Sequence, residues 1–137
     1  MFYEQAQSIE NGDPMIRIFC FTDHDSLESS RAYADPETRK AYDRNVNEYK
    51  IIEKVGVNLF LAYQSTNRVV TVGPRDVYHY IFYIIDRDDT VTAILFDEQK
   101  PECKNKVRMR LFIGGLRVKP LKDDPRGKCS CELLLKM

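Results

Sequence analysis

The 137-residue sequence carries no net charge, because its 21 basic side chains balance its 21 acidic ones. Both signs are interspersed, so the sequence gives no case for a nucleic-acid partner or for strong attraction to an anionic membrane. It has no apolar run near the ~20 residues that cross a bilayer, and its N-terminus lacks the basic and apolar regions of a secretory signal. We therefore expect one cytoplasmic domain covering residues 1–137.

Motifs for catalysis and metal binding are also missing. The sequence contains no nucleophile elbow and no phosphate-binding loop. His24 precedes Asp25 directly, which suits a helix cap better than a catalytic dyad, and no carboxylate or nucleophile is placed near His79 by the sequence. Cys129 and Cys131 are two residues apart, which is not the spacing of a zinc site. We expect no enzymatic activity, no cofactor and no metal, and we expect reduced thiols.

What the sequence does contain is a long β-prone stretch, residues 69–85, which is its most apolar segment. Gly73-Pro74 interrupts it, so we expect two strand segments joined by a bend. Arg75 and Asp76 follow the bend between apolar residues. We interpret them as a structural ion pair that anchors this corner.

The order of the predicted elements indicates an α+β domain. Two strands (2–9 and 15–21) precede two short helices, one over 27–33 and one beginning at Pro36. Further strands follow at 46–54, 59–66, 69–85, 90–96 and 128–137, with a hairpin-like pair at 107–113 and 116–121 turning at Gly114-Gly115. The prediction is a long curved antiparallel sheet of about eight strands, with two short helices inserted after the second strand.

Five short motifs, in order and compatibly spaced, resemble START lipid-transfer domains. They are Asp35-Pro36-Glu37-Thr38-Arg39-Lys40-Ala41-Tyr42-Asp43-Arg44-Asn45-Val46, Gly73-Pro74-Arg75-Asp76-Val77, Lys100-Pro101-Glu102-Cys103, Val107-Arg108-Met109-Arg110 followed by Gly114-Gly115-Leu116-Arg117-Val118-Lys119-Pro120-Leu121, and Asp123-Asp124-Pro125. The sequence departs from the family pattern at Tyr42, where the family has Trp, and at Val77, where it has Phe.

The resemblance implies the helix-grip fold, in which a curved sheet closes around a long C-terminal helix and encloses a lipid-sized cavity. The sequence stops before that gripping helix and lacks the family's N-terminal helix, so we expect a truncated domain whose concave face has no cover from its own chain. The implied function is non-enzymatic binding of a lipid, with its transfer between membranes and transient membrane contact. The alternative is an interaction module, in which a partner helix or a second copy covers the uncovered sheet face.

Strand alternation, together with the resemblance, assigns one set of side chains to the lipid cavity. Most of them are apolar, while Gln64 and the Tyr83 hydroxyl are the candidate polar contacts. The alternative interpretation is that they are ordinary core residues. The set is Phe60, Ala62, Gln64, Ile81, Tyr83, Ala93, Leu95, Met109 and Leu111.

The resemblance also favours a phospholipid over a sterol. Sterol-binding members have a buried acidic residue and an arginine at places that hold Ala62 and Ile81 in this sequence. Arg39 occupies the place of an arginine that contacts lipid phosphate in phosphatidylcholine-transfer members, and a guanidinium suits phosphate geometry. The alternative role of Arg39 is a solvated or structurally paired helix arginine.

Two further groups on the predicted strands have alternative roles. Tyr78, Tyr80, Phe82 and Ile84 form the opposite face of the central strand, and they either pack under the two short helices or provide a partner surface. Arg108 and Arg110 alternate with Met109 and Leu111 along their strand, so we expect both arginines on a solvated face of the sheet.

Overall fold

A computed structural model describes residues 2–7, 14–68, 73–101, 105–109 and 113–136. It forms one nine-stranded sheet and two helices, α1 (Ser26–Ala34) and α2 (Pro36–Tyr42). The strands are β1 (Phe2–Gln7), β2 (Pro14–Thr22), β3 (Val46–Lys54), β4 (Leu59–Thr66), β5 (Arg75–Ile85), β6 (Val91–Asp97), β7 (Val107–Arg108), β8 (Ile113–Pro120) and β9 (Cys129–Lys136).

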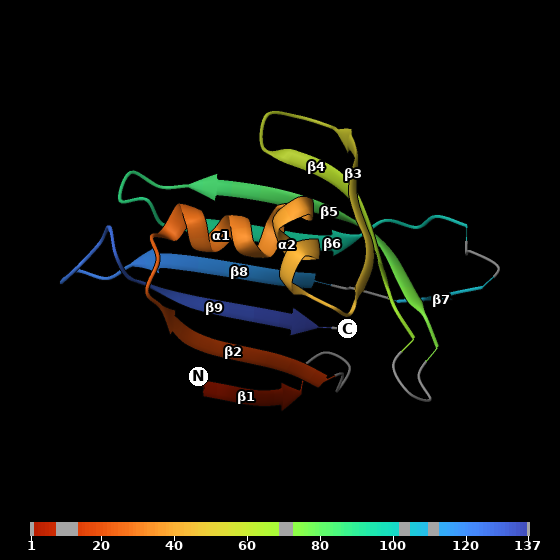
Figure 1. The fold of residues 1–137 in the computed structure, drawn as a ribbon, viewed down its shortest axis with the longest axis horizontal. Helices are drawn as coiled ribbons and strands as arrows, with labels where there is room; N and C mark the ends of the chain where they lie inside the picture. The colour runs from red at the N-terminus through yellow and green to blue at the C-terminus, as the bar shows by residue number, and fades with distance from the viewer. Residues whose placement is uncertain (1, 8–13, 69–72, 102–104, 110–112, 137) are drawn as a thin grey trace.

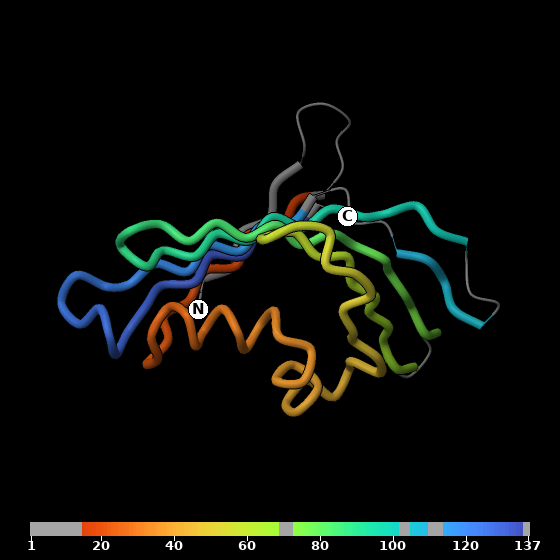
Figure 2. Tube along the Cα trace, turned by 90° about the horizontal axis from the view of Figure 1, so that it is seen from above, coloured from red at the N-terminus to blue at the C-terminus, as the bar shows by residue number. Residues whose placement is uncertain are grey.

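The sheet is antiparallel along the order β1-β2-β9-β8-β6-β5-β4-β3, and the short β7 pairs in parallel with β5. Seen from above in Figure 2, the sheet curves into an arch, and both helices of Figure 1 lie beneath its concave side. This confirms the predicted α+β architecture, with two short helices following the second strand.

Alternation along the strands divides the side chains between the two faces, as the sequence predicted. On β5, Val77, His79 and Ile81 are buried, whereas Phe82 and Ile84 are more than one-third exposed. The register aligns Ile81 with Phe60 of β4 and with Leu95 of β6. Facing side chains of this kind on β3, β4, β5, β6, β8 and β9 form one buried core on the concave face.

The helices cover part of this concave face, which corrects the expectation that the chain leaves it uncovered and excludes one of the two alternatives for the opposite face. α1 contacts β6, β8 and β9, while α2 packs against β3. Tyr33 of α1 packs on the same core as Ile81 and Tyr83. The chain therefore supplies some cover of its own on the concave face. Tyr80 and Phe82 lie on the convex face and do not pack under the helices. The Tyr80 ring contacts the Phe96 ring there, with the ring centroids 5.2 Å apart.

The hairpin predicted at Gly114-Gly115 is wrong. β8 runs straight through both glycines, pairing with β6 on one side and with β9 on the other. A Cβ atom at Gly115 would meet the Ala93 carbonyl oxygen only at an ordinary 3.8 Å, so no tight turn requires glycine there. The predicted strand segment at 69–72 lies outside the described residues, and β5 begins directly after the Gly73-Pro74 corner.

Among the described residues, neither helix has the length and apolarity that a membrane crossing requires.

Candidate functional site

The candidate site is an open apolar cavity between α1 and the concave face of the sheet. Its volume is about 350 Å³. Aliphatic and aromatic side chains make most of the wall, and Arg31 and Asp35 add charge at its edge. The lining residues are Leu27, Ser30, Arg31, Ala34, Asp35, Pro36, Ile51, Phe60, Tyr83, Ile85 and Val91.

Local sequence fixes the two helices that bound this cavity. Asp25 caps α1, because its carboxylate accepts the Glu28 backbone N–H at 2.7 Å. Asp35 separates the helices and caps α2 in the same way, accepting the Thr38 N–H at 2.9 Å. The hydrogen bonds from Thr38 hold the pKa of the Asp35 carboxyl below its usual value, and Pro36 occupies the first turn of α2, where its missing N–H has no cost.

The structure brings most of the predicted residues to one face but only two of them to the cavity wall. Phe60 and Tyr83 line the cavity, and their rings meet edge to face with centroids 6.0 Å apart. Gln64 is half-buried on the same face, and Met109 follows β7, away from the cavity wall. Leu111 and Arg110 lie outside the described residues. The other predicted residues form the buried core of the concave face: Ala62, Ile81, Ala93 and Leu95.

Arg39 lies on α2 and is held by contacts within the chain. Its Nε donates to the Asp43 carboxylate at 3.2 Å, its Nη1 reaches the Tyr33 carbonyl oxygen at 3.4 Å, and its guanidinium stacks 4.8 Å from the centre of the Tyr33 ring. The Arg39 and Asp43 side chains are about one-fifth exposed. A guanidinium fixed in this way is preorganised, although Asp43 already neutralises part of its charge.

Three tyrosines are buried on the concave side of the sheet, and Tyr33 is the one that stacks on Arg39. Burial raises the pKa of the Tyr83 hydroxyl to about 12, and it also raises the pKa values of Tyr49 and Tyr33. The Tyr49 hydroxyl donates to the Ala34 carbonyl oxygen at 2.9 Å, which ties the end of α1 to β3. All three hydroxyls therefore stay protonated at neutral pH, and that of Tyr49 is the one with a donated hydrogen bond among the described residues.

His79 is a concave-face residue that the sequence interpretation missed. Its side chain is 2% exposed, its Nδ1 has no hydrogen-bond partner among the described residues, and its ring lies 6.2 Å from that of Tyr49. Burial lowers the pKa of His79 to about 4; a backbone contact at Tyr80 opposes this shift, and the positive charge of Arg39 adds to it. The signal was available, since His79 has the same strand parity as Ile81 and Tyr83.

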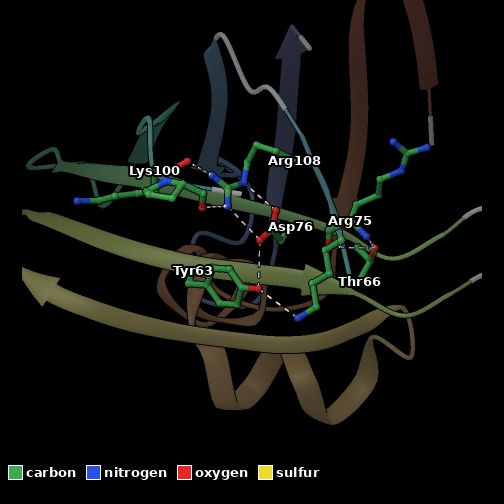
Figure 3. Close-up of polar contacts among 8 residues, drawn as sticks. Tyr63, Thr66, Arg75, Asp76, Lys100 and Arg108 are labelled. Carbon is green, nitrogen blue, oxygen red and sulfur yellow. Dashed lines mark hydrogen bonds and ion pairs between the residues drawn. The ribbon is translucent and has the colours of Figure 1, made fainter. Parts of the chain in front are cut away.

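The corner at Arg75-Asp76 is anchored differently from the expectation. Asp76 is fully buried, and its carboxylate accepts hydrogen bonds from Arg108, through Nε at 2.7 Å and Nη2 at 3.2 Å. The guanidinium of Arg108 also donates to the carbonyl oxygens of Lys100 and Pro101, and Tyr63 donates to Asp76 (Figure 3). Arg75 points away from Asp76, so the expected Arg75–Asp76 pair and the expected solvated Arg108 are both wrong.

A second cavity of about 420 Å³ lies on the other side of α1. Its wall includes Thr22, Ser29, Ala32 and Cys131. The Cys129 and Cys131 sulfurs lie 4.0 Å apart beneath α1. Burial, together with the neighbouring Cys129 and Cys20, raises the pKa of Cys131 to about 12, so this thiol is protonated. In the part of the chain that the structure describes, no group of His, Cys, Asp and Glu side chains is arranged to hold a metal ion.

Comparisons with known proteins identify a family with this architecture. The family model of the START domain matches residues 3–136. Human StAR-related lipid transfer protein 5 is similar in structure, with a TM-score of 0.83 and 20% identity over 98% of this chain and 65% of that chain. Human STARD10 gives 0.81 with 18% identity, over 98% of this chain and 60% of that one.

A bacterial structure shows the same likeness. The STAR-related lipid transfer protein from Xanthomonas axonopodis, a fragment of residues 25–204, gives a TM-score of 0.71 and 14% identity over 98% of this chain and 82% of that chain. No curated protein matches the sequence. The chain spans less than two thirds of the length of the human StAR-related lipid transfer protein 5 and STARD10 structures.

Proposed function

Because this chain belongs to the START domain family, we propose that it binds a lipid in the apolar cavity beside α1 and acts as a cytoplasmic lipid carrier. The observation that carries the proposal is the cavity itself, whose apolar wall comes from four strands and α1 and opens to solvent. A mostly apolar hollow with a few polar groups at its edge is the usual form of a site for an apolar ligand. Two of the similar structures, from human and Xanthomonas axonopodis, are those of StAR-related lipid transfer proteins.

The proposed role is binding without catalysis. The imidazole on the concave face, His79, is sealed from the cavity and does not line it. Its pKa of about 4 leaves it neutral at pH 7, and a general base must reach the proton that it removes. The hydroxyls near the cavity belong to tyrosines whose raised pKa values make them donors rather than nucleophiles.

Within the lipid class, we favour a phospholipid over a sterol. Ala62 and Ile81 are fully buried in the apolar core, so these two positions offer no charged pair to a sterol hydroxyl. Arg39 on α2 and the hydroxyl of Tyr83 in the cavity wall offer hydrogen-bond donors, and a phosphate group accepts such donors. Exchange of Asp43 for a lipid phosphate at Arg39 would keep the guanidinium paired.

Filling the cavity mouth is expected to abolish lipid uptake. Ile51 lines the cavity and is 41% exposed, so Ile51→Trp adds a large ring at the opening without enlarging the core. We expect at least a tenfold lower amount of phosphatidylcholine extracted from vesicles, measured by native mass spectrometry of the reisolated protein. The matched control is Ile52→Trp, since Ile52 is 46% exposed and does not line the cavity.

The two variants and the wild type separate the parts of this proposal. Equal loss in both variants would show that the ring acts on the fold and not on the cavity. If the wild type extracts cholesterol in preference to phosphatidylcholine, the phospholipid assignment is wrong while lipid binding stands. If the wild type extracts neither lipid, the proposed function fails.

A lipid carrier must also touch membranes, and we propose the β3–β4 loop for this contact. Val57 is 85% exposed and Val55 is 47% exposed at its tip, while hydrogen bonds from Val55 and Gly56 to the Leu59 carbonyl oxygen hold the turn. Ile51 and Ile85, both exposed, continue this apolar surface to the cavity mouth. An inserted loop would thus join the cavity to the hydrocarbon of a leaflet.

Val57→Asp is expected to weaken association with phosphatidylcholine vesicles by about tenfold. This is the loss expected when burial of one valine side chain, worth about 1.5 kcal/mol, is removed. Vesicle flotation measures the association. Val107→Asp serves as the control, because Val107 is 52% exposed and pairs near the opposite end of β5. Equal weakening by both variants would rule out the loop as the specific contact.

A further inference from the structure

The contact of α1 with the sheet is made by small side chains. Its buried residues are Ser26, Ser30 and Ala34, spaced four apart, so they share the face of the helix that lies on the sheet. Beneath them are buried apolar side chains of β6 and β8, including Ala93, Leu116 and Val118. Two serines and an alanine remove little apolar surface from water, so this face adds little hydrophobic burial, and the N-terminal half of the helix needs other contacts to hold it to the sheet.

Three polar contacts hold the N-terminal half of α1. The Ser26 hydroxyl donates to the Asp89 carbonyl oxygen at 2.6 Å. The Ser29 hydroxyl lies 3.2 Å from the Cys129 sulfur and 2.9 Å from the Thr22 hydroxyl. We call these contacts the latch; all of them involve the first four residues of the helix.

The C-terminal end of α1 is anchored separately. The Tyr49 hydroxyl donates to the Ala34 carbonyl oxygen at 2.9 Å, and the Tyr42 hydroxyl donates to the Ala32 carbonyl oxygen. Tyr33 is packed under the stacked guanidinium of Arg39. Release of the latch would therefore leave α1 attached at its C-terminal end, where Asp35 joins it to α2.

α1 also separates the two cavities of the concave face. Leu27 and Ser30 line the cavity of about 350 Å³ on one side, and Ser29 and Ala32 line the cavity of about 420 Å³ on the other. Each lies in the lower half of the range of about 300–1,000 Å³ in which proteins hold drug-sized molecules. A phospholipid with two acyl chains is larger than such molecules, so neither cavity alone accommodates it.

We propose that α1 is the lid of the lipid site and opens at its N-terminal end. Breaking the latch lets the helix pivot about the Tyr49–Ala34 anchor, joins the two cavities, and exposes Leu116 and Val118 as the floor on which the acyl chains lie. Loop and helix motions of this kind control access to many binding sites. The inference rests on the proposed lipid binding and adds the route by which the lipid enters.

A reversible covalent lock tests the lid. Ser29→Cys places a second thiol where the Ser29 oxygen lies 3.2 Å from the Cys129 sulfur, within the range that side-chain rotation can close to a disulfide. Oxidised glutathione takes up two electrons and two protons from the thiol pair as the S–S bond forms, and yields two molecules of reduced glutathione. Peptide mapping by mass spectrometry identifies the intended bond, and Cys131→Ala in the same chain removes the competing sulfur 4.0 Å away.

The measured quantity is the rate at which the protein takes up fluorescent phosphatidylcholine from vesicles. We expect the oxidised S29C/C131A protein to take up the lipid at least tenfold more slowly than its reduced form, and dithiothreitol to restore the rate. The C131A parent is the control, and we expect its uptake rate to be the same before and after the same oxidation. If the locked protein takes up lipid as fast as the reduced form, α1 is not the lid.

A second variant acts in the opposite direction and needs no disulfide. Ser26→Ala removes the hydrogen bond to Asp89 and leaves the small helix face unchanged, so we expect uptake to become severalfold faster. An unchanged or slower rate contradicts the latch. If the reduced variants and the wild type all take up no phosphatidylcholine, the proposed function fails and this inference fails with it. If only the oxidised, locked protein loses lipid uptake, the result supports the lid.

Discussion

Arg108→Met is expected to lower the free energy of unfolding by about 3–5 kcal/mol, the usual cost of leaving a buried charge without its partner. Asp76 is fully buried, and the Arg108 guanidinium supplies two of its hydrogen bonds. The same guanidinium holds the carbonyl oxygens of Lys100 and Pro101, so the variant also releases the loop between β6 and β7. Urea denaturation at pH 7 measures the change.

Two controls separate the ion pair from a general effect of losing an arginine. Arg75→Met removes the neighbouring half-buried arginine, which points away from Asp76 (Figure 3), and is expected to cost less than about 1 kcal/mol. Adding Asp76→Asn to Arg108→Met removes the buried charge that has lost its arginine and should recover part of the loss. Equal costs for Arg75→Met and Arg108→Met would contradict the assignment of Arg108 as the partner.

The second large effect is a loss of stability in mild acid caused by His79. In the unfolded chain His79 takes up a proton near pH 6.5, whereas in the folded protein burial delays protonation until about pH 4. Between these values the unfolded state binds more protons, so the free energy of unfolding falls as the pH falls. The stabilisation is fully present above pH 6.5 and decreases by about 3 kcal/mol toward pH 4.

His79→Leu is expected to remove most of this pH dependence. Urea denaturation at pH 7 and at pH 4.5 gives the two free energies for each protein. His24→Gln is the matched control, because His24 is exposed and should leave the loss in acid unchanged. If the wild type is equally stable at both pH values, His79 is not buried in its neutral form.

The period of two along the strands explains why the concave face was predictable. Ile81 and Tyr83 alternate with Tyr80 and Phe82, and a strand has no other way to divide such a sequence between its faces. The same rule predicts that His79 lies on the concave face, because it alternates with the same neighbours as Ile81. The sequence interpretation considered only that His79 lacks catalytic neighbours. The rule would also have excluded an Arg75–Asp76 pair, because successive side chains of a strand point to opposite faces.

The remaining errors concern long-range packing, which local pattern does not contain. Gly114-Gly115 has the composition of a turn, but pairing with β6 and β9 on both sides keeps β8 extended. The position of α1 under the arch depends on small residues, Ser26 and Ser30, that form no apolar stripe in the sequence. The spacing of residues in the sequence therefore predicts neither the cavity beside α1 nor Arg108 as the partner of Asp76.

The strand order has a consequence for how the chain acquires this fold. β2 pairs with β1 on one side and with β9 on the other, so Cys20 meets Cys131 across the whole length of the domain. During synthesis, the edge of β2 that β9 will occupy stays open until the ribosome has delivered nearly all of residues 2–136, and β8 waits for the same strand. Because such distant pairings close slowly and leave unpaired edges exposed meanwhile, β9 is the strand whose arrival turns two separate, aggregation-prone segments into one continuous sheet.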